Sequence, residues 1–289
     1  MLKISIDDIL KSTKGKSLLN YKEEDISYIS TSSKDIKENT LFIPIIGEVY
    51  DGHKFMEDAY NNGCRNFLID ENHKFDKEDI NLIQVKNTTV ALGNIANFYL
   101  KKFNIDIIGV TGSVGKTSTR DIIYSVLNEK YKTLKNEGNF NNEIGIPKTL
   151  FNLDETYELA VIEMGIDKKG DINYFRTIAD PKISVISNIG LSHIANFKNQ
   201  EGIFNAKMEI ADGFSKENTL IINGDDKFLK TLKTKNLSYN LLSYGFEKDN
   251  TIYCTSYEIQ NGKINFTCKY NDKELNFSIP SIAKHNIYN

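Results

Sequence analysis

The sequence predicts an α/β protein with a small N-terminal α/β domain and a central domain built on a mostly parallel sheet that ends in antiparallel hairpins. Two observations predict this class. Short apolar runs alternate with helical patterns along most of the chain, as a parallel sheet covered on both faces requires. Near the end, Asn-Gly and Asn-Asp pairs separate alternating strands, which is typical of hairpins. We expect the domains to span residues 1–84 and 85–289.

In the N-terminal domain, the pattern predicts four short elements. Asp7 is expected to cap a first helix, and the apolar run at residues 41–46 indicates a strand. Residues 54–62 place apolar side chains on one helical stripe, which ends at Gly63. Residues 67–69 are expected to form the second strand.

The central domain is expected to open with a helix capped by Thr88. Four apolar runs then predict parallel strands at residues 107–110, 159–162, 183–186 and 220–222. From residue 240 onward the pattern changes to alternating strands, with Asn261-Gly262 and Asn271-Asp272 as the expected turns.

The bulk composition is that of an ordinary globular chain and excludes several classes. The 289 residues are 40% hydrophobic and 26% charged, and a net charge of -3 argues against a nucleic-acid-binding or membrane-binding surface. The start of the chain has acids where a signal peptide needs an apolar run, and no segment could span a bilayer. We expect a cytoplasmic monomer. Cys64, Cys254 and Cys268 are far apart in the sequence, suit a reducing compartment and are interpreted as packing residues.

One segment is typical of a phosphate cradle. The apolar run at 107–110 leads into a small-residue loop and a helix start that carries Lys116 and Thr117. Backbone N–H groups of such a loop face the anion, Lys116 reaches the terminal phosphates and the Thr117 hydroxyl can hold Mg2+. A Cβ on either loop glycine would hinder the turn or the approach of the backbone. The predicted nucleotide contacts are Thr111, Gly112, Ser113, Val114, Gly115, Lys116, Thr117 and Ser118.

Residues that follow the other strands are further candidates, because ligands of parallel sheets bind beyond the carboxyl ends of the strands. Glu163 follows the second run, where a metal on the γ-phosphate would lie, and the third run leads to His193. Mg2+ prefers hard oxygen ligands, which favours Glu163 and Thr117. His193 is a less natural ligand and could instead orient a water or hold a second ion. Taken singly, each side chain could equally be solvated or structural.

Lys207 lies within an apolar helical stripe. The stripe consists of Ile203, Ala206, Ile210, Ala211 and Phe214. A lysine that extends to solvent is the ordinary alternative. Burial would instead lower the pKa of the amine and favour its neutral, nucleophilic form. Such an amine can react with CO2 to give a carbamate, an oxygen ligand suited to Mg2+.

These segments together resemble the Mur ligase family, the ATP-dependent amide-forming enzymes of peptidoglycan precursor synthesis. The resemblance covers the whole chain, and it rests on residues 111–117, 163–165, 188–193, 206–210 and 285–289. It implies ATP and Mg2+ as cofactors, with a CO2-derived carbamate on Lys207. The implied catalytic residues are Lys116, Glu163, His193 and Lys207, and the implied metal ligands are Thr117, Glu163, His193 and Lys207. The implied adenine contacts are His285 and Asn286.

Within the family, two features favour the enzyme that adds D-alanyl-D-alanine to UDP-N-acetylmuramoyl-tripeptide. They are the run at residues 139–147 and the Glu-Met-Gly motif at 163–165. The N-terminal segment resembles a UDP-binding domain, and the implied substrate contacts are Ser33, Lys34, Gly47, Asp51, His53, Asn141 and Asn142. Lys34 stands where the family usually has Arg, so it offers a point charge rather than a bidentate fork. By resemblance, the substrate carboxylate attacks the γ-phosphate of ATP, and the dipeptide amine then displaces phosphate from the acyl phosphate.

The chain stops at residue 289, within an expected helix start. The family's C-terminal ligase domain is missing, so we expect a fragment that is inactive alone. Three other interpretations remain open: another Mur-type ligase, a P-loop kinase or NTPase unrelated to the cell wall, and a binding module without catalysis. A kinase or motor NTPase needs neither a lysine on an apolar face nor a UDP-binding domain.

Overall fold

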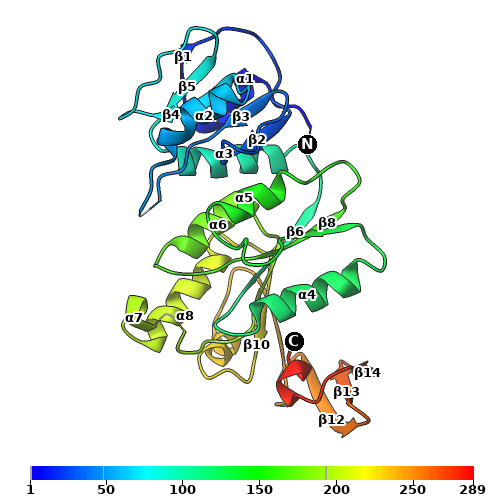
Figure 1. Cartoon of the computed structure of the whole chain (residues 1–289). Helices are drawn as coiled ribbons and strands as arrows, with labels where there is room; N and C mark the ends of the chain where they lie inside the picture. The colour runs from blue at the N-terminus through cyan, green and yellow to red at the C-terminus, as the bar shows by residue number, and fades with distance from the viewer. Residues whose placement is uncertain (1, 48, 193) are drawn as a thin grey trace. The chain divides into compact units, whose positions relative to one another are not determined.

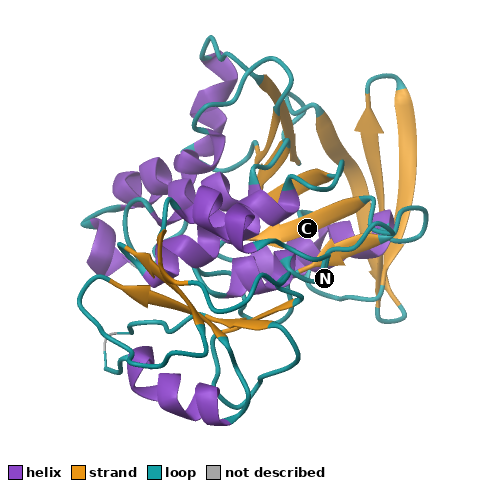
Figure 2. Ribbon diagram, turned by 90° about the horizontal axis from the view of Figure 1, so that it is seen from above, coloured by secondary structure: helices purple, strands orange, loops and turns teal. Residues whose placement is uncertain are grey.

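A computed structural model describes residues 2–47, 49–192 and 194–289 of the chain. The chain forms two compact units, and both combine helices with strands (Figures 1 and 2). The first unit comprises Met1–Asn104 and Glu143–Thr156, and the second comprises Ile105–Asn142 and Tyr157–Asn289. The first unit therefore extends past residue 84, the boundary expected from the sequence, and it also takes in a later segment.

A five-stranded sheet forms the centre of the first unit, in the order β1-β5-β4-β3-β2. Its strands are β1 (Lys16–Leu19), β2 (Tyr28–Ser30), β3 (Thr40–Phe42), β4 (Asn66–Asp70) and β5 (Asn81–Val85). Neighbouring strands are parallel except for β1 and β5. The helices are α1 (Ile6–Thr13), the 3-10 helix η1 (Gly52–Phe55), α2 (Met56–Asn61), α3 (Thr88–Leu100) and α5 (Gly145–Leu150).

Aromatic and aliphatic side chains form the core of this unit. The rings of Phe42 and Phe67 pack edge to face, with centroids 6.0 Å apart, and both side chains are almost fully buried. Burial of a side chain of this size contributes about 2 kcal/mol. Ile146 and Leu150 on α5 are also fully buried, and α5 packs against α3. This packing explains why α5 belongs to the first unit although it follows the first strands of the second.

Two helix caps expected from the sequence are wrong by one or two residues. Ser5, not Asp7, caps α1, because its hydroxyl accepts a hydrogen bond from a first-turn N–H. Asn87, not Thr88, caps α3 in the same way, and Thr88 is buried in the first turn. In each case the residue that caps the helix has the extended backbone that an N-cap requires, whereas the residue expected to cap it already lies within the helix.

The other N-terminal elements lie close to where the sequence predicts them. The strand expected at residues 41–46 ends at Phe42, before Pro44, which has no N–H to offer a strand ladder. Gly63 follows α2 with φ +94°, the left-handed conformation expected where a helix ends.

A nine-stranded sheet forms the centre of the second unit, in the order β14-β13-β12-β11-β10-β9-β6-β8-β7. Its strands are β6 (Asp106–Thr111), β7 (Thr133–Lys135), β8 (Leu159–Glu163), β9 (Ile183–Ile186), β10 (Thr219–Asn223), β11 (Asn240–Gly245), β12 (Ile252–Gln260), β13 (Lys263–Tyr270) and β14 (Lys273–Ile279). The α-helices are α4 (Lys116–Leu127), α6 (Asp171–Ala179), α7 (Ile194–Phe197) and α8 (Gln200–Met208). The 3-10 helices are η2 (Glu209–Ala211), η3 (Leu229–Thr234) and η4 (Lys284–Ile287).

The predicted fold class, a mostly parallel sheet with C-terminal hairpins, is confirmed. The four apolar runs are β6, β8, β9 and β10, and they pair in parallel. β11, the first strand after residue 240, is parallel to both β10 and β12, and antiparallel pairing begins between β12 and β13, at the first predicted hairpin. A connection that contains η3 returns the chain to the end of the sheet where β10 starts, so β11 runs in the same direction. Asn261 and Asn271 have φ of 54° at the predicted hairpin turns.

Within the described part of the chain, every helix is too short or too polar to cross a bilayer.

Candidate nucleotide and substrate sites

The loop between β6 and α4 has the backbone of a phosphate cradle. β6 pairs with β8 and β9 on its two sides, so the loop starts at the carboxyl end of a central strand. Gly112 has to be glycine, because a Cβ there would lie 1.9 Å from the hydroxyl oxygen of Ser187. Gly115 has φ +81° and immediately precedes the first turn of α4. The N–H groups of that turn have no acceptor within the helix and can donate to a bound anion.

Asn188 fixes the shape of this loop. Its side-chain oxygen accepts hydrogen bonds from the backbone N–H groups of Ser113 and Val114, at 3.2 and 2.9 Å. Its amide nitrogen donates to the Val114 carbonyl at 2.9 Å, and the Ser187 hydroxyl donates to the same carbonyl at 2.8 Å. The amides of Ser113 and Val114 are therefore used within the protein. The N–H groups at the start of α4, in residues 116–118, remain as backbone donors for a phosphate.

Glu163, the last residue of β8, is the buried carboxylate of this site. Only 2% of the residue is exposed. It accepts hydrogen bonds from the Thr117 hydroxyl at 2.9 Å, the Arg120 guanidinium at 3.3 Å and the Asn141 amide at 2.8 Å. The structure thus brings together Thr117, Asn141 and Glu163, which the sequence analysis identified separately. Arg120 was missed, although its place one turn after Lys116 on the same helix was a usable signal.

Lys207 on α8 lies against the phosphate loop. It is 1% exposed, as its apolar stripe predicts, and its Nζ donates a hydrogen bond to the Gly112 carbonyl at 2.8 Å. Burial, and secondly the positive charge of Lys116, lower the pKa of Lys207 to about 7. A large share of the amine is therefore neutral near neutral pH, and the neutral amine is the nucleophilic form.

The C-terminal segment, residues 281–289, also contacts α4. The Thr119 hydroxyl donates to the side-chain oxygen of Asn289 at 3.2 Å, and the Asn289 amide donates to the side-chain oxygen of Asn286 at 3.1 Å. Asn286 in turn donates to the Ser281 hydroxyl at 2.7 Å. His285 lies on the same 3-10 helix, η4, and is exposed. The expected adenine contacts therefore belong to the unit that carries the phosphate loop.

The remaining residues predicted for this site differ in accessibility. Thr111 is fully buried, and its hydroxyl donates to the Met164 carbonyl at 3.0 Å, so its side chain ties β6 to the end of β8. Ser118 and Asn142 are exposed. His193, predicted as a metal ligand and catalytic residue, lies outside the described residues.

In the first unit, Asp51 and His53 belong to a network that also includes His73 and Asp70. His73 has one ring nitrogen 2.8 Å from an Asp51 oxygen and the other 2.7 Å from Asp70. The Nδ1 of His53 lies 2.8 Å from the second oxygen of Asp51. The hydrogen bond to Asp70 raises the pKa of His73; burial opposes this rise and Asp51 adds to it. Burial raises the pKa of Asp51, but hydrogen bonds from His53 and His73 outweigh it and bring the value to about 2.

This network suits hydrogen bonding better than a shared metal ion. The ligand atoms of Asp51, His53 and His73 all lie within 4.8 Å of one another. The two imidazole rings, however, are stacked with centroids 3.8 Å apart and planes 4° from parallel. An imidazole binds a metal in the plane of its ring, and one ion cannot lie in two parallel planes. We interpret the network as a His73 imidazolium held between two carboxylates.

The other substrate contacts predicted in this unit lie in the loops after β2 and β3. Ser33 is buried, and its carbonyl accepts a hydrogen bond from the Asn62 side chain at 2.8 Å, whereas Lys34 is exposed. The Gly47 N–H donates to the Tyr50 carbonyl at 2.9 Å in a turn. A Cβ on Gly47 would meet the Tyr50 ring at 2.9 Å, so the turn favours glycine.

A cavity of about 340 Å³ lies beside β2, which is an edge strand of the first sheet. Ser30, Ser32 and Asp35 line it from the β2 side, and Lys148 lines it from α5. Burial lowers the pKa of Lys148, although the negative charge of Asp35 opposes this. Lys148 presents a half-buried amine to the cavity. Sequence spacing gives no sign of this role for Lys148, because α5 is far from β2 along the chain.

The residues beside the phosphate loop fit a magnesium ion. Mg2+ favours hard oxygen ligands near phosphate. The Thr117 hydroxyl oxygen and a Glu163 carboxylate oxygen are 2.9 Å apart at the start of α4. Asn141 and Arg120 hold the carboxylate in this orientation.

A parallel sheet in which a central strand leads through a glycine loop to a helix with Lys116 and Thr117, beside a buried carboxylate, defines a P-loop nucleotide-binding protein. Two family descriptions match the chain. The Mur ligase middle domain matches residues 110–289, and the catalytic domain of the Mur ligase family matches residues 25–100. The chain belongs to the Mur ligase family.

Individual relatives carry one common name. The chain is 36% identical to the UDP-N-acetylmuramoyl-tripeptide--D-alanyl-D-alanine ligase of Bacillus subtilis (strain 168), over 100% of this chain and 62% of that protein. It is 34% identical to the ligase of the same name from Buchnera aphidicola subsp. Baizongia pistaciae, over 91% of this chain and 57% of that protein.

Solved structures agree with these sequence matches. A crystal structure of MurF from Acinetobacter baumannii matches with a TM-score of 0.92 at 26% identity, over 100% of this chain and 63% of that one. A structure of MurF ligase from Thermotoga maritima in complex with ADP matches with a TM-score of 0.82 at 27% identity, over 90% of this chain and 60% of that one. The chain thus spans less than two thirds of the length of these relatives.

Proposed function

We propose that this chain supplies the nucleotide-binding and UDP-substrate-binding units of an ATP-dependent, ADP-forming ligase of peptidoglycan precursor synthesis. The reaction adds D-alanyl-D-alanine to UDP-N-acetylmuramoyl-tripeptide, as the names of the relatives say of those proteins. One observation carries the proposal: the Thr117 hydroxyl and the buried Glu163 carboxylate meet at 2.9 Å beside the phosphate loop. A cytoplasmic location fits the three free cysteines.

The proposed reaction has two steps. An oxygen of the tripeptide carboxylate attacks the γ-phosphorus of ATP, the bond from that phosphorus to the bridging oxygen breaks, and ADP and an acyl phosphate form. The dipeptide amine then attacks the acyl carbon, inorganic phosphate leaves and the nitrogen loses a proton. The first step brings two anions together, so positioning and positive charge supply most of the catalysis.

The residues of the second unit have distinct parts in this reaction. Lys116 and the first N–H groups of α4 bind the β- and γ-phosphates. Thr117 and Glu163 would hold Mg2+, which supplies positive charge opposite the γ-phosphate when it is bound. Asn141 keeps Glu163 oriented through their 2.8 Å hydrogen bond. His193 is a further candidate ligand in this proposal.

Lys207 is proposed to carry a carbamate. Its neutral amine attacks the carbon of CO2, an N–C bond forms and the nitrogen releases a proton. Support comes from its burial, from its pKa of about 7 and from its position against the Gly112 carbonyl. The resulting carboxylate would add a second anionic oxygen ligand beside the phosphate loop.

Recognition of the UDP-linked substrate is assigned to the first unit. Ser33, Lys34 and the turn at Gly47 follow parallel strands at their carboxyl ends, where ligands of such sheets bind. Lys148 contributes a half-buried cation to the cavity beside β2, which suits the diphosphate of a UDP-sugar. Asn141 and Asn142 are the proposed contacts from the second unit.

Binding measurements test this proposal, because every residue assigned above to the two sites lies in this chain. Calorimetric titration is expected to show binding of MgATP and, separately, of UDP-N-acetylmuramoyl-tripeptide. Lys116→Met should abolish MgATP binding and retain the UDP-peptide, whereas Lys148→Met should weaken the UDP-peptide and retain MgATP. Lys130→Met, on an exposed lysine, is the charge-matched control. Binding of MgATP without any binding of the UDP-peptide would favour a P-loop kinase or NTPase instead.

The carbamate has a separate test. With 13C-labelled bicarbonate, the unaltered chain should give a carbamate carbon signal, and Lys207→Met should not. Lys116→Met should retain a signal at saturating bicarbonate, because it leaves the Lys207 amine in place and buried, although loss of the Lys116 charge raises the pKa of that amine. Absence of the signal from the unaltered chain at saturating bicarbonate would reject the carbamate and leave the nucleotide-binding proposal standing.

A further inference from the structure

Two of the three cysteines face each other across neighbouring strands. Cys254 on β12 pairs in register with Cys268 on β13. Residues directly opposite in antiparallel strands project to the same face of the sheet, with Cβ atoms about 4.5–5.5 Å apart. The Cys254 thiol donates a hydrogen bond to the Ser256 carbonyl at 3.4 Å. This placement falls in the range of Cα separations that a disulfide can bridge.

The pairing is a consequence of the hairpin and of one irregularity in it. Asn261 and Gly262 form the tight turn, and counting back from that turn would place Cys254 opposite Lys269. A β-bulge between Cys254 and Ser256 adds one residue to β12 and shifts the register. The shift brings the sulfur of Cys268 opposite that of Cys254.

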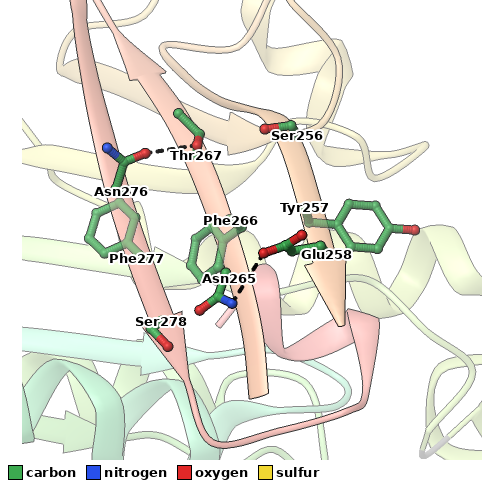
Figure 3. A pocket seen from close by; sticks show the side chains of 9 residues that line it. All are labelled: Ser256, Tyr257, Glu258, Asn265, Phe266, Thr267, Asn276, Phe277 and Ser278. Carbon is green, nitrogen blue, oxygen red and sulfur yellow. Dashed lines mark hydrogen bonds between the residues drawn. The ribbon is translucent and has the colours of Figure 1, made fainter. Parts of the chain in front are cut away.

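The side chains next to the pair hold this register in place. Figure 3 shows the adjoining part of β12–β14, where the Thr267 hydroxyl donates to the Asn276 side chain at 2.8 Å and the Asn265 amide donates to Glu258 at 3.4 Å. These groups line a hollow of about 510 Å³ on the sheet. The cross-strand hydrogen bonds tie all three strands together, so the two sulfurs stay opposite each other.

We propose that Cys254 and Cys268 are a site of reversible oxidation by peroxides, which converts the two thiols to a disulfide. The sulfur of Cys254 attacks one peroxide oxygen, the O–O bond breaks, and a sulfenic acid and one water form. The sulfur of Cys268 then attacks the sulfur of Cys254, the S–O bond breaks and a second water leaves. Two thiols are oxidised and one hydrogen peroxide is reduced to two waters.

The surroundings decide both the order of these steps and their speed. Burial raises the pKa of Cys254, but the contact with the Ser256 backbone, the neighbouring Cys268 side chain and the charge of Lys284 oppose this, so Cys254 is the better first nucleophile. Burial raises the pKa of Cys268 to about 11. With both residues 8% exposed, the pair stays reduced under ordinary conditions and reacts under sustained peroxide.

The pair also lies close to the C-terminal segment. Lys284, whose charge acts on Cys254, is the first residue of η4, and its ammonium lies over the rings of Phe246 and Tyr257. The disulfide would therefore cross-link β12 and β13 beside the segment that carries His285 and Asn286.

The test exposes the reduced, full chain to hydrogen peroxide and counts thiols after denaturation. We expect two of the three thiols to disappear, the mass to fall by two hydrogens, and a digest to contain the Cys254 and Cys268 peptides linked together. Dithiothreitol should restore all three thiols. Cys64, which is buried in the first unit, is the internal control, and Cys64→Ala should form the same disulfide. Cys254→Ala and Cys268→Ala should form no intramolecular disulfide.

Persistence of all three thiols at peroxide concentrations that oxidise exposed cysteines would overturn the proposal. So would a digest in which the oxidised cysteines are sulfinic acids or are linked between different chains. The linked-peptide assay uses the unaltered chain, so its result does not depend on whether a variant folds.

Discussion

At the scale of single residues, Glu163 organises the nucleotide site. Its carboxylate accepts hydrogen bonds from a hydroxyl, a guanidinium and an amide, and its backbone N–H donates to the Asn136 side chain at 2.9 Å. A buried charge is stable only when it is paired and hydrogen-bonded, and Arg120 is the buried cation that pairs with it. The position of Glu163 is therefore set before any ligand binds.

Glu163→Gln should weaken MgATP binding by about tenfold or more, because it removes the anionic oxygen proposed to hold Mg2+; a tenfold change corresponds to about 1.4 kcal/mol. Affinity for ATP measured with EDTA should change little. Calorimetry with and without Mg2+ separates the two effects, and Glu129→Gln, on an exposed glutamate, is the control. An equal loss with and without Mg2+ would show that Glu163 acts only in the structure of the loop.

His73 should titrate above the ordinary histidine range. The pKa of His73 is raised in the folded chain, so its ion pairs contribute stability that is fully present below about pH 6.5 and is lost as the pH rises through the folded pKa. Proton NMR of the ring signals gives the pKa directly. Asp70→Asn should lower it, because the hydrogen bond to Asp70 is the main cause of the rise. A pKa of His73 that does not respond to Asp70→Asn would contradict the network.

The candidate residues show what a sequence can reveal at this scale. Lys207 could be identified because its neighbours three and four positions away are apolar, so a helix buries it. His73 and Lys148 could not be assigned roles, since each depends on a partner or a cavity wall from a distant segment. Local spacing predicts which face of an element a side chain occupies, but not what that face will meet.

At the scale of elements, the phosphate loop is shaped by the residues that follow β9. Asn188 makes two hydrogen bonds to loop amides and one to a loop carbonyl. Each contributes about 1 kcal/mol to holding the loop. The loop is therefore preorganised by a neighbouring strand end rather than by its own glycines alone.

Asn188→Ala should speed hydrogen exchange at the amide of Val114 and should lower nucleotide affinity by roughly tenfold, because that donor loses its acceptor. The Ser113 N–H keeps the backbone carbonyl of residue 188, at 3.0 Å. Exchange mass spectrometry and calorimetry measure the two effects. Asn188→Asp retains the acceptor oxygens and should fall between the unaltered chain and Asn188→Ala. Unchanged exchange at Val114 in Asn188→Ala would mean that another group holds the loop.

The strands themselves were largely predictable, whereas their order and register were not. The runs that form β6, β8, β9 and β10 are apolar because both faces of a parallel sheet are covered. β7 and β2 have three residues each, too few to show a period. The direction of β11 depends on the path of the connection before it, and the Cys254–Cys268 pairing depends on a bulge. Neither the direction of this strand nor this pairing can be predicted from hydrophobic periodicity.

At the scale of the whole molecule, the proposed ligands should act on different units. ADP should slow hydrogen exchange in the first turn of α4, at residues 116–118. UDP should slow exchange between residues 30 and 53. Ligand contacts protect the amides they order. Exchange mass spectrometry with each ligand alone tests this, with β14 as the internal reference. Protection of the same peptides by both nucleotides would contradict separate sites.

The backbone passes between the two units three times, at Asn104–Ile105, Asn142–Glu143 and Thr156–Tyr157. One protease cut at Asn104–Ile105 would separate residues 1–104 from the rest of the chain, but residues 143–156 of the first unit would stay covalently joined to the second unit. An expression fragment ending at Asn104 would lack α5 and uncover the surface of α3 on which it packs. Anyone wishing to produce the first unit on its own would have to graft residues 143–156 back through an artificial linker. Simple truncation would yield a piece prone to misfolding and aggregation.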